Sequence, residues 1–253
     1  PSKVCQYDTG LPLGVPDEVS PAANQVIERL ENAEVSVLDL RRNLHEEGRS
    51  HEELFFHTDH HWNSEGAFWG YQKLTERLNA DFGYEIDDTL RERENFRQKD
   101  FPEGFLGSYG KRTGKYFGGV DDISVILPDF EVSLRMEVPD RGIVREGDFS
   151  QALLDFSQIT DAWYYDDSHI PYAVYTGDDY NLMRIINENA ENDKKLLLLK
   201  DSFVRPVASF LSLGIRQVEA IDLRIEPKIS VKEYLNAQKP DGQRSLLAAK
   251  DSF

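Results

Sequence analysis

The chain has 253 residues, 40% of them hydrophobic, and a formal net charge of −17. This length and apolar content are enough to bury a substantial core, in one large domain or two small ones. The acidic balance argues against a nucleic-acid partner, because binding a phosphate backbone requires clustered lysine and arginine. Such a surface is compatible with a neutral substrate such as a polysaccharide.

The sequence contains few features that indicate cellular location or redox environment. No segment approaches the roughly 20 consecutive apolar residues that a membrane-spanning helix needs. The N-terminus has neither a basic nor an apolar region of the kind that makes an export signal, so such a signal has been removed or never existed. A single cysteine, Cys5, excludes an internal disulfide and a thiolate metal cluster.

The first third of the chain alternates between helix and strand signals. Residues 1–20 contain several Pro and Gly without a steady period and are interpreted as a linker. Apolar residues at near-helical spacing predict a helix from Pro21, followed by a short buried strand at 35–38. A second helix is predicted to begin at Asn63 and to end near Gly83.

Residues 87–175 differ in character, with short alternating runs and many glycines that predict β-structure. The apolar content of this segment is too thin for a core of its own. We therefore expect a β-rich insertion within a single domain that spans residues 1–253.

From Tyr180 the α/β alternation returns. Apolar patterns predict, in order, a helix at 182–186, a buried strand at 196–199, a helix at 206–213, a strand at 218–223 and a helix at 231–238. Beyond these, only residues 246–249 offer an apolar run. The last strand of the sheet is therefore predicted to be absent or rearranged.

One polar turn is the candidate catalytic element. The apolar run 196–199 leads directly into Lys-Asp-Ser-Phe at 200–203, which is how an α/β sheet presents a serine at the carboxyl end of a strand. Upstream, Asp59 and His61 are two residues apart, so an extended or turn-like backbone would place both side chains on one side. With Ser202 they have the composition of a nucleophilic triad, in which histidine takes the serine proton and the carboxylate orients the imidazole.

Other interpretations of these residues stay open. Asp201 and Ser202 are also favoured helix caps. His57 and His61 are four apart and could share a metal ion on a helix, although the helix-start signals follow both of them and Thr58 replaces the glutamate of a metal-binding helix. We expect neither a metal nor another cofactor. The absence of a Gly-x-Ser-x-Gly motif around Ser202 argues against a standard α/β-hydrolase.

The motif Thr-Asp-His-His-Trp at 58–62, followed by Asn-Ser-Glu-Gly-Ala, resembles the signature of the DHHW proteins. These are relatives of the alginate O-acetylation proteins AlgX and AlgJ, in the wider SGNH hydrolase-like class. The similarity continues through residues 105–110, Asn187, 200–203 and 221–224. It implies an α/β, SGNH-like (flavodoxin-like) three-layer domain with a parallel sheet and a β-rich insertion. Lys200 stands where many relatives have glycine.

The resemblance also implies site roles and a function. Ser202 would be the nucleophile, His61 the base and Asp59 the orienting carboxylate of an O-acetyltransferase that acts on a cell-surface or secreted polysaccharide. Its acetyl donor would be relayed by a membrane-bound O-acyltransferase, outside the cytoplasm, with the chain as the soluble portion of an exported or membrane-anchored protein. A carbohydrate acetyl esterase and a non-catalytic glycan-binding subunit of an acetylation complex are the alternatives.

The residue types also indicate which backbone groups could stabilise the oxyanion of the reaction. For the oxyanion, the Ser202 N–H is the best donor, and Gly107 and Gly177 are further candidates because glycine allows close backbone approach.

Three residues are candidates for contact with the glycan. Trp62 could stack on a sugar ring, and Tyr109 with Arg112 could line a groove. The alternatives are a core tryptophan and a solvated loop.

Overall fold

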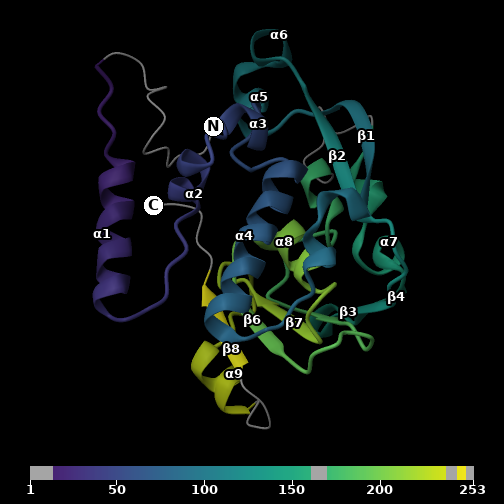
Figure 1. The fold of residues 1–253 in the computed structure, drawn as a ribbon. Helices are drawn as coiled ribbons and strands as arrows, with labels where there is room; N and C mark the ends of the chain where they lie inside the picture. The colour runs from purple at the N-terminus through teal and green to yellow at the C-terminus, as the bar shows by residue number, and fades with distance from the viewer. Residues whose placement is uncertain (1–13, 161–169, 238–243, 249–253) are drawn as a thin grey trace.

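A mixed six-stranded sheet forms the centre of the protein (Figure 1). The computed structural model describes residues 14–160, 170–237 and 244–248. In chain order the strands of this sheet are β3 (Leu134–Val138), β4 (Ile143–Gly147), β5 (Leu182–Ile186), β6 (Lys195–Leu199), β7 (Gln217–Ile221) and β8 (Arg244–Ala248). Their spatial order is β4-β3-β5-β7-β6-β8.

Strand direction departs from the prediction of a parallel sheet. Strand β6 is parallel to β7 and β8, whereas the β7–β5, β5–β3 and β3–β4 pairs are antiparallel. The α/β class is confirmed, and the sheet is parallel only at one side. Parallel pairing requires a crossover connection. Helix α8 (Val204–Leu211) lies between β6 and β7, and helix α9 (Val231–Ala237) lies between β7 and β8.

The predicted β-rich segment is divided between two sheets. Strands β1 (Phe96–Phe105) and β2 (Asp121–Pro128) form a separate antiparallel pair, while β3 and β4 extend the main sheet. Short 3-10 turns connect these elements: η1 (Asp88–Arg91), η2 (Arg93–Asn95), η3 (Pro139–Arg141), η4 (Phe156–Gln158) and η5 (Pro171–Val174).

Helices cover both faces of the main sheet. The described helices are α1 (Val19–Asn32), α2 (Leu40–Glu46), α3 (His51–Leu54), α4 (Ser64–Phe82), α5 (Ser108–Thr113), α6 (Lys115–Gly118), α7 (Phe149–Leu153), α8 (Val204–Leu211) and α9 (Val231–Ala237). Of these, α4, α7 and α8 pack on one face of the sheet and α9 packs on the other. Alternate residues of β6 separate the two layers, since Leu196 and Leu198 face the core shared with α4 and α8. Leu197 packs instead with Leu235 of α9. This arrangement gives the three layers that the resemblance implied.

Phe210 of α8 is the centre of the main core. Its ring lies within 5.2–6.2 Å of five aromatic rings, those of Phe68, Tyr71, Phe96, Phe149 and Tyr175. Offset and edge-on contacts of this kind add to the stabilisation from burial. They attach α8, which follows the candidate serine, to α4 and to the β1–β2 pair.

Helix α4 begins and ends as predicted. The Asn63 side chain accepts a hydrogen bond from the Gly66 N–H at 2.9 Å, and Gly83 closes the helix with a left-handed φ of 58°. Among the described residues, no helix has both the length and the apolar character needed to cross a membrane.

Three element predictions were wrong. Residues 182–186 form strand β5 and not a helix, because a short fully apolar run fits a buried strand as well as a helix. Residues 35–38 pair with no described strand, and Val35 is exposed. The last strand is present, because β8 pairs in parallel with β6 at the sheet edge.

Candidate active site

Ser202 lies at the end of the sheet where strands β6 and β7 finish and strand β5 begins. Leu199 of β6 pairs with Ile221 of β7, and Ile221 pairs with Leu182 of β5. The carboxyl ends of β6 and β7 therefore meet the amino end of antiparallel β5. The Lys200 N–H extends the ladder by one bond, to the Ile221 carbonyl at 2.9 Å, before the chain turns into α8.

A short loop between α3 and α4 carries Asp59 and His61. The Phe55–Trp62 bridge closes this loop, and the Phe56 N–H donates to the His61 carbonyl at 3.2 Å. Thr58 fixes the middle of the loop: its hydroxyl donates to Asp121 at 2.6 Å and its carbonyl accepts two N–H groups from the start of α5. The loop is thus held from β2 and from α5.

The two segments, 141 residues apart in sequence, meet in a continuous hydrogen-bonded line. His61 Nε2 lies 2.7 Å from Ser202 Oγ, and His61 Nδ1 lies 2.5 Å from Asp59 Oδ1. All three side chains are buried. A serine, an imidazole and a carboxylate at these distances can pass a proton from the hydroxyl to the ring.

The environment of Asp59 keeps it ionised. Burial alone would raise its pKa, but the hydrogen bond and charge of His61, with the N–H of Ser108, hold the pKa of this carboxyl well below its usual range. The Ser108 N–H donates to Asp59 Oδ2 at 2.7 Å. One oxygen of the carboxylate therefore orients His61 while the other is held by the start of α5.

The imidazole is also enclosed by aromatic rings. Tyr172 stacks on His61 with ring centroids 3.9 Å apart and planes at 21°, and Phe203 lies 4.8 Å from the same ring. Burial raises the pKa of the Tyr172 phenol well above its usual range, so this ring stays neutral. The sequence analysis did not identify Tyr172, since it lies in a 3-10 turn with no motif around it.

The three predicted oxyanion donors differ in whether their backbone N–H groups are already hydrogen-bonded. The Ser202 N–H has no acceptor in the described part of the chain, so it is available to a ligand. The Gly107 N–H already donates to Thr58 Oγ1 at 2.9 Å, and the Gly177 N–H donates to the Ala173 carbonyl at 2.9 Å. The structure therefore does not support the two glycines as oxyanion donors.

Trp62 is partly buried and packs against the core. A Cβ on Gly66 or Gly70 would lie 2.9 Å from its side chain, so it packs directly on the glycines of α4. Its indole N–H donates to the Phe203 carbonyl at 3.1 Å. The structure favours a packing role for Trp62, which joins the His61 loop to the turn after Ser202.

The two other predicted binding residues are on α5. Tyr109 is half-buried, with its ring centroid 6.2 Å from that of His60, while Arg112 is exposed. His60 itself is partly exposed and lies 3.9 Å, ring to ring, from His61. Tyr109 therefore lies at the rim of the site, and Arg112 lies farther out on the helix.

A buried ion cluster supports the turn that carries Ser202. Arg205 contacts Asp179 at 2.6 Å, and Lys200 bridges Asp179 and Asp222, the latter at 3.4 Å. Arg224 contacts Asp222 at 2.7 Å. Burial would raise the pKa of Asp179, but Arg205 and Lys200 outweigh it and hold that pKa well below the usual range. Lys200, the departure from the family pattern, thus supplies a buried positive charge beside the site.

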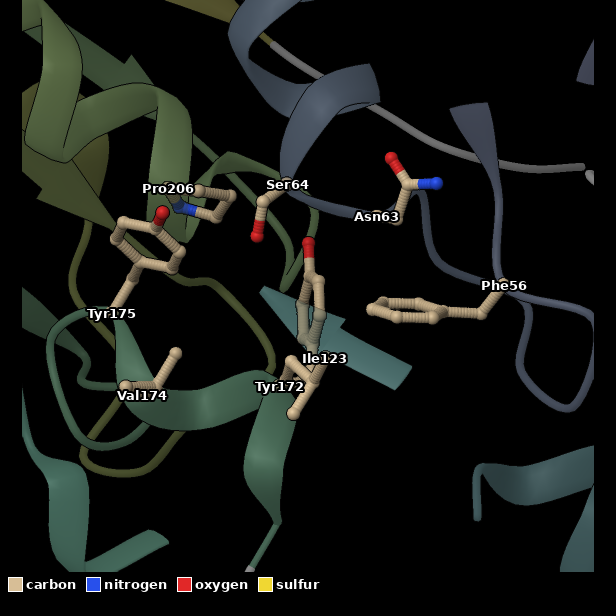
Figure 2. Close-up of a pocket in the computed structure, with 8 residues that line it drawn as sticks. All are labelled: Phe56, Asn63, Ser64, Ile123, Tyr172, Val174, Tyr175 and Pro206. Carbon is tan, nitrogen blue, oxygen red and sulfur yellow. The ribbon is translucent and has the colours of Figure 1, made fainter. Parts of the chain in front are cut away.

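Neither of two described cavities is lined by Asp59, His61 or Ser202. The first, of about 10 Å³, lies behind the Tyr172 ring (Figure 2) and has room for about one water molecule. The second, of about 230 Å³, is lined by Asn187 and Asn189. Asn187 follows the carboxyl end of β5, at the end of the sheet opposite to Ser202. Its side chain donates hydrogen bonds to the Ser212 and Leu213 carbonyls, just after α8.

Potential metal ligands at the site are already engaged. His57, which could pair with His61 on a helix, instead faces Asp121 at 3.7 Å. Among the described residues, Asp59, His60 and His61 place donor atoms within 4.8 Å of one another. A metal ion there would displace the hydrogen bond between Asp59 and His61.

The chain has a fold of the SGNH hydrolase-like kind. The family model described as the SGNH hydrolase-like domain of the acetyltransferase AlgX matches residues 1–108. This confirms the predicted resemblance over that part of the chain, which contains Asp59 and His61. Ser202 lies outside the matched residues, so its assignment depends on the geometry.

Solved structures confirm the fold. Bacillus cereus PatB1 with a sulfonyl adduct has a TM-score of 0.68 and 21% identity, over 94% of this chain and 76% of that one. A second PatB1 structure has a TM-score of 0.66 at 21% identity, over 94% and 77%. A DHHW family protein from Eubacterium siraeum has a TM-score of 0.58 and 17% identity, over 80% and 60%. No curated protein matches the chain.

Proposed function

We propose that this protein is an O-acetyltransferase that carries an acetyl group on Ser202 and transfers it to a hydroxyl of a polysaccharide. The observation that carries the proposal is the hydrogen-bonded line from Ser202 through His61 to Asp59. The AlgX family model, which describes an acetyltransferase, supports the choice of an acetyl group.

In the first half-reaction, Ser202 Oγ attacks the carbonyl carbon of the acetyl donor while its proton moves to His61 Nε2. The Ser202 N–H, which has no acceptor in the described residues, stabilises the oxyanion. The tetrahedral intermediate then expels the donor's leaving group, to which His61 returns the proton. The product is an acetyl ester on Ser202.

In the second half-reaction, His61 removes the proton of a glycan hydroxyl, whose oxygen attacks the Ser202 ester. Collapse of the second intermediate releases the acetylated glycan and returns the proton to Ser202 Oγ. Asp59 stabilises the imidazolium formed in each half and fixes the ring tautomer.

The surroundings of Ser202 suit a long acceptor. Of the two cavities, the one nearer the triad holds about one water molecule and is too small for a substrate. A polymer that lies across an exposed rim needs no deep pocket. We further propose that the acetyl donor is relayed by a membrane-bound O-acyltransferase and that the reaction takes place outside the cytoplasm.

The test uses a chromogenic acetyl ester, with and without a panel of glycans, and follows both released chromophore and intact protein mass. Wild type should form an acetyl-enzyme and pass the acetyl group to a glycan. Ser202→Ala and His61→Ala should each lower the rate by at least about 10³-fold. The matched control is Ser150→Ala on α7, which packs on β3 and β4 at the side of the sheet away from β6; it should retain the rate.

Each alternative has its own outcome. Acetyl release to water alone, with every glycan present, would indicate an esterase. Glycan binding without any acetyl-enzyme would indicate a binding subunit. A sulfonyl fluoride is an independent probe, because it adds to an activated serine with loss of fluoride; we expect one adduct, on Ser202 and absent in Ser202→Ala.

A further inference from the structure

An exposed aromatic pair lies at one extremity of the molecule, on the short helix α6 at the top of Figure 1. Tyr116 is 97% exposed and Phe117 is 86% exposed, the highest values for large apolar side chains among the described residues. A Cβ added at Gly114 or Gly119 would meet no atom within 4 Å. The outer part of this segment, residues 114–119, therefore stands away from the rest of the protein, and we call residues 107–119 the tip.

The tip is basic, whereas the chain is strongly acidic. Residues 107–119 contain Lys111, Arg112 and Lys115 and no carboxylate, whereas the whole chain has a formal charge of −17. A local reversal of sign next to exposed aromatic rings marks a surface for an anionic partner.

The base of the tip is fixed to the candidate active site. The Ser108 N–H holds Asp59, and the N–H groups of Tyr109 and Gly110 both donate to the Thr58 carbonyl at 2.9 Å. Whatever binds the tip is therefore held at a defined side of the triad.

The form of the tip favours a lipid surface over a glycan chain. Aromatic rings that bind sugars need a fixed orientation. Tyr116 and Phe117 are almost fully exposed, and the Tyr116 ring lies beside the flexible Lys115 side chain, with Nζ 5.4 Å from the ring centroid. Insertion into a lipid interface requires no such orientation, and tyrosine, phenylalanine, lysine and arginine are the residues favoured there. A convex tip also fits a surface better than a single chain.

We propose that this tip docks on an anionic lipid surface, with Tyr116 and Phe117 inserted at the headgroup level and the three cations beside lipid phosphates. The remaining acidic surface would be repelled, so only the tip side would approach the membrane. Docking would hold the side of the site that contains α5 towards the lipid. This inference does not depend on the reaction that Ser202 performs.

Vesicle co-sedimentation tests the proposal, with full-length protein and vesicles of phosphatidylcholine alone or with phosphatidylglycerol. Wild type should sediment with the anionic vesicles and more weakly with the neutral ones. The double variant Tyr116→Ser/Phe117→Ser should lose at least tenfold in partition coefficient. The matched control Phe82→Ser removes a half-exposed aromatic from the end of α4 and should bind like wild type.

Two further measurements test the contribution of charge to vesicle binding and the folding of the double variant. Lys115→Ser should weaken anionic binding about fivefold, the effect of one cation near such a surface. The double variant should keep wild-type activity on a soluble ester, which shows that it folds. No sedimentation of wild type, or equal sedimentation of the double variant, would overturn the proposal. The proposal would also be overturned if the double variant bound a soluble glycan more weakly than wild type but bound vesicles equally well.

Discussion

At the scale of single residues, Gly107 is the position where the site tolerates least change. A Cβ there would lie 2.2 Å from the Asp59 Cβ, a distance that real side chains do not adopt. The absence of a side chain lets the start of α5 reach the carboxylate with its Ser108 N–H. Gly107 was predicted as an oxyanion donor, but the contacts assign it to positioning Asp59.

We expect Gly107→Ala to displace Asp59 and with it the His61 ring. Overpacking of this kind costs about 1–3 kcal/mol of stability, and a misplacement of about 1 Å costs on the order of 10²-fold in rate. Unfolding in urea and ester turnover measure the two effects. Gly118→Ala is the control, because its Cβ would meet only Thr113 Oγ1 at 3.3 Å; equal activity of the two variants would contradict this role.

At the scale of elements, the turn between β6 and α8 is held mainly by charge. Asp179, from the amino end of β5, contacts both Lys200 before Ser202 and Arg205 after it. The Lys200 and Arg205 side chains are almost fully buried. Loss of Asp179 would leave Arg205 without this ion partner and Lys200 with the longer contact to Asp222, at 3.4 Å. One carboxylate thus fixes the two sides of the nucleophile turn.

We predict that Asp179→Asn costs about 3–5 kcal/mol of stability, the usual effect of leaving buried charges without their partner. Ser202 should also react more slowly with a sulfonyl fluoride. The adjacent Asp178→Asn is the matched control, because its ion pair with Arg141 is about half exposed and should contribute less than about 1 kcal/mol. Equal urea midpoints for the two variants would exclude the role assigned to Asp179.

At the scale of the whole molecule, the carboxylates with lowered pKa determine the response to acid. The pKa values of Asp59, Asp179 and Asp222 all lie below the usual range, in each case because bound partners outweigh the effect of burial. Between their folded pKa and about 3.9, the value of an unfolded aspartate, the unfolded chain binds more protons than the folded one. Their stabilisation is complete above about pH 4 and is lost as the pH falls through the folded pKa.

We therefore expect the free energy of unfolding to fall steeply below about pH 4. Asp179→Asn removes one of these groups, so its stability should decrease less steeply over the same range. Urea midpoints at several pH values between 7 and 2.5 measure both slopes. Parallel curves for wild type and variant would show that Asp179 does not titrate in this way.

Local chemistry accounts for the parts that the sequence predicted well. Helix α4 has its cap at Asn63 and its stop at Gly83, and both signals act within one turn. Asp59 and His61 share a side because the loop bends there and the Asp59 carboxylate accepts the His61 backbone N–H at 3.1 Å. Ser202 follows an apolar strand. Asp59, His61 and Ser202 were predicted to form a triad, and in the structure they lie at hydrogen-bonding distance from one another in that order.

Tertiary structure alone decided the rest. Residues 182–186 became a strand because antiparallel partners lie on both sides of them, which the apolar pattern by itself does not encode. Tyr172 and Asp179 have no motif, and they reach the site only through the folded arrangement of η5 and β5. Gly107 and Gly177 lost their predicted roles because the fold supplies acceptors for their N–H groups. Sequence by itself determined the reactive side chains and their local geometry; long-range packing decided which groups surround and support them, because such contacts depend on residues far apart in the chain.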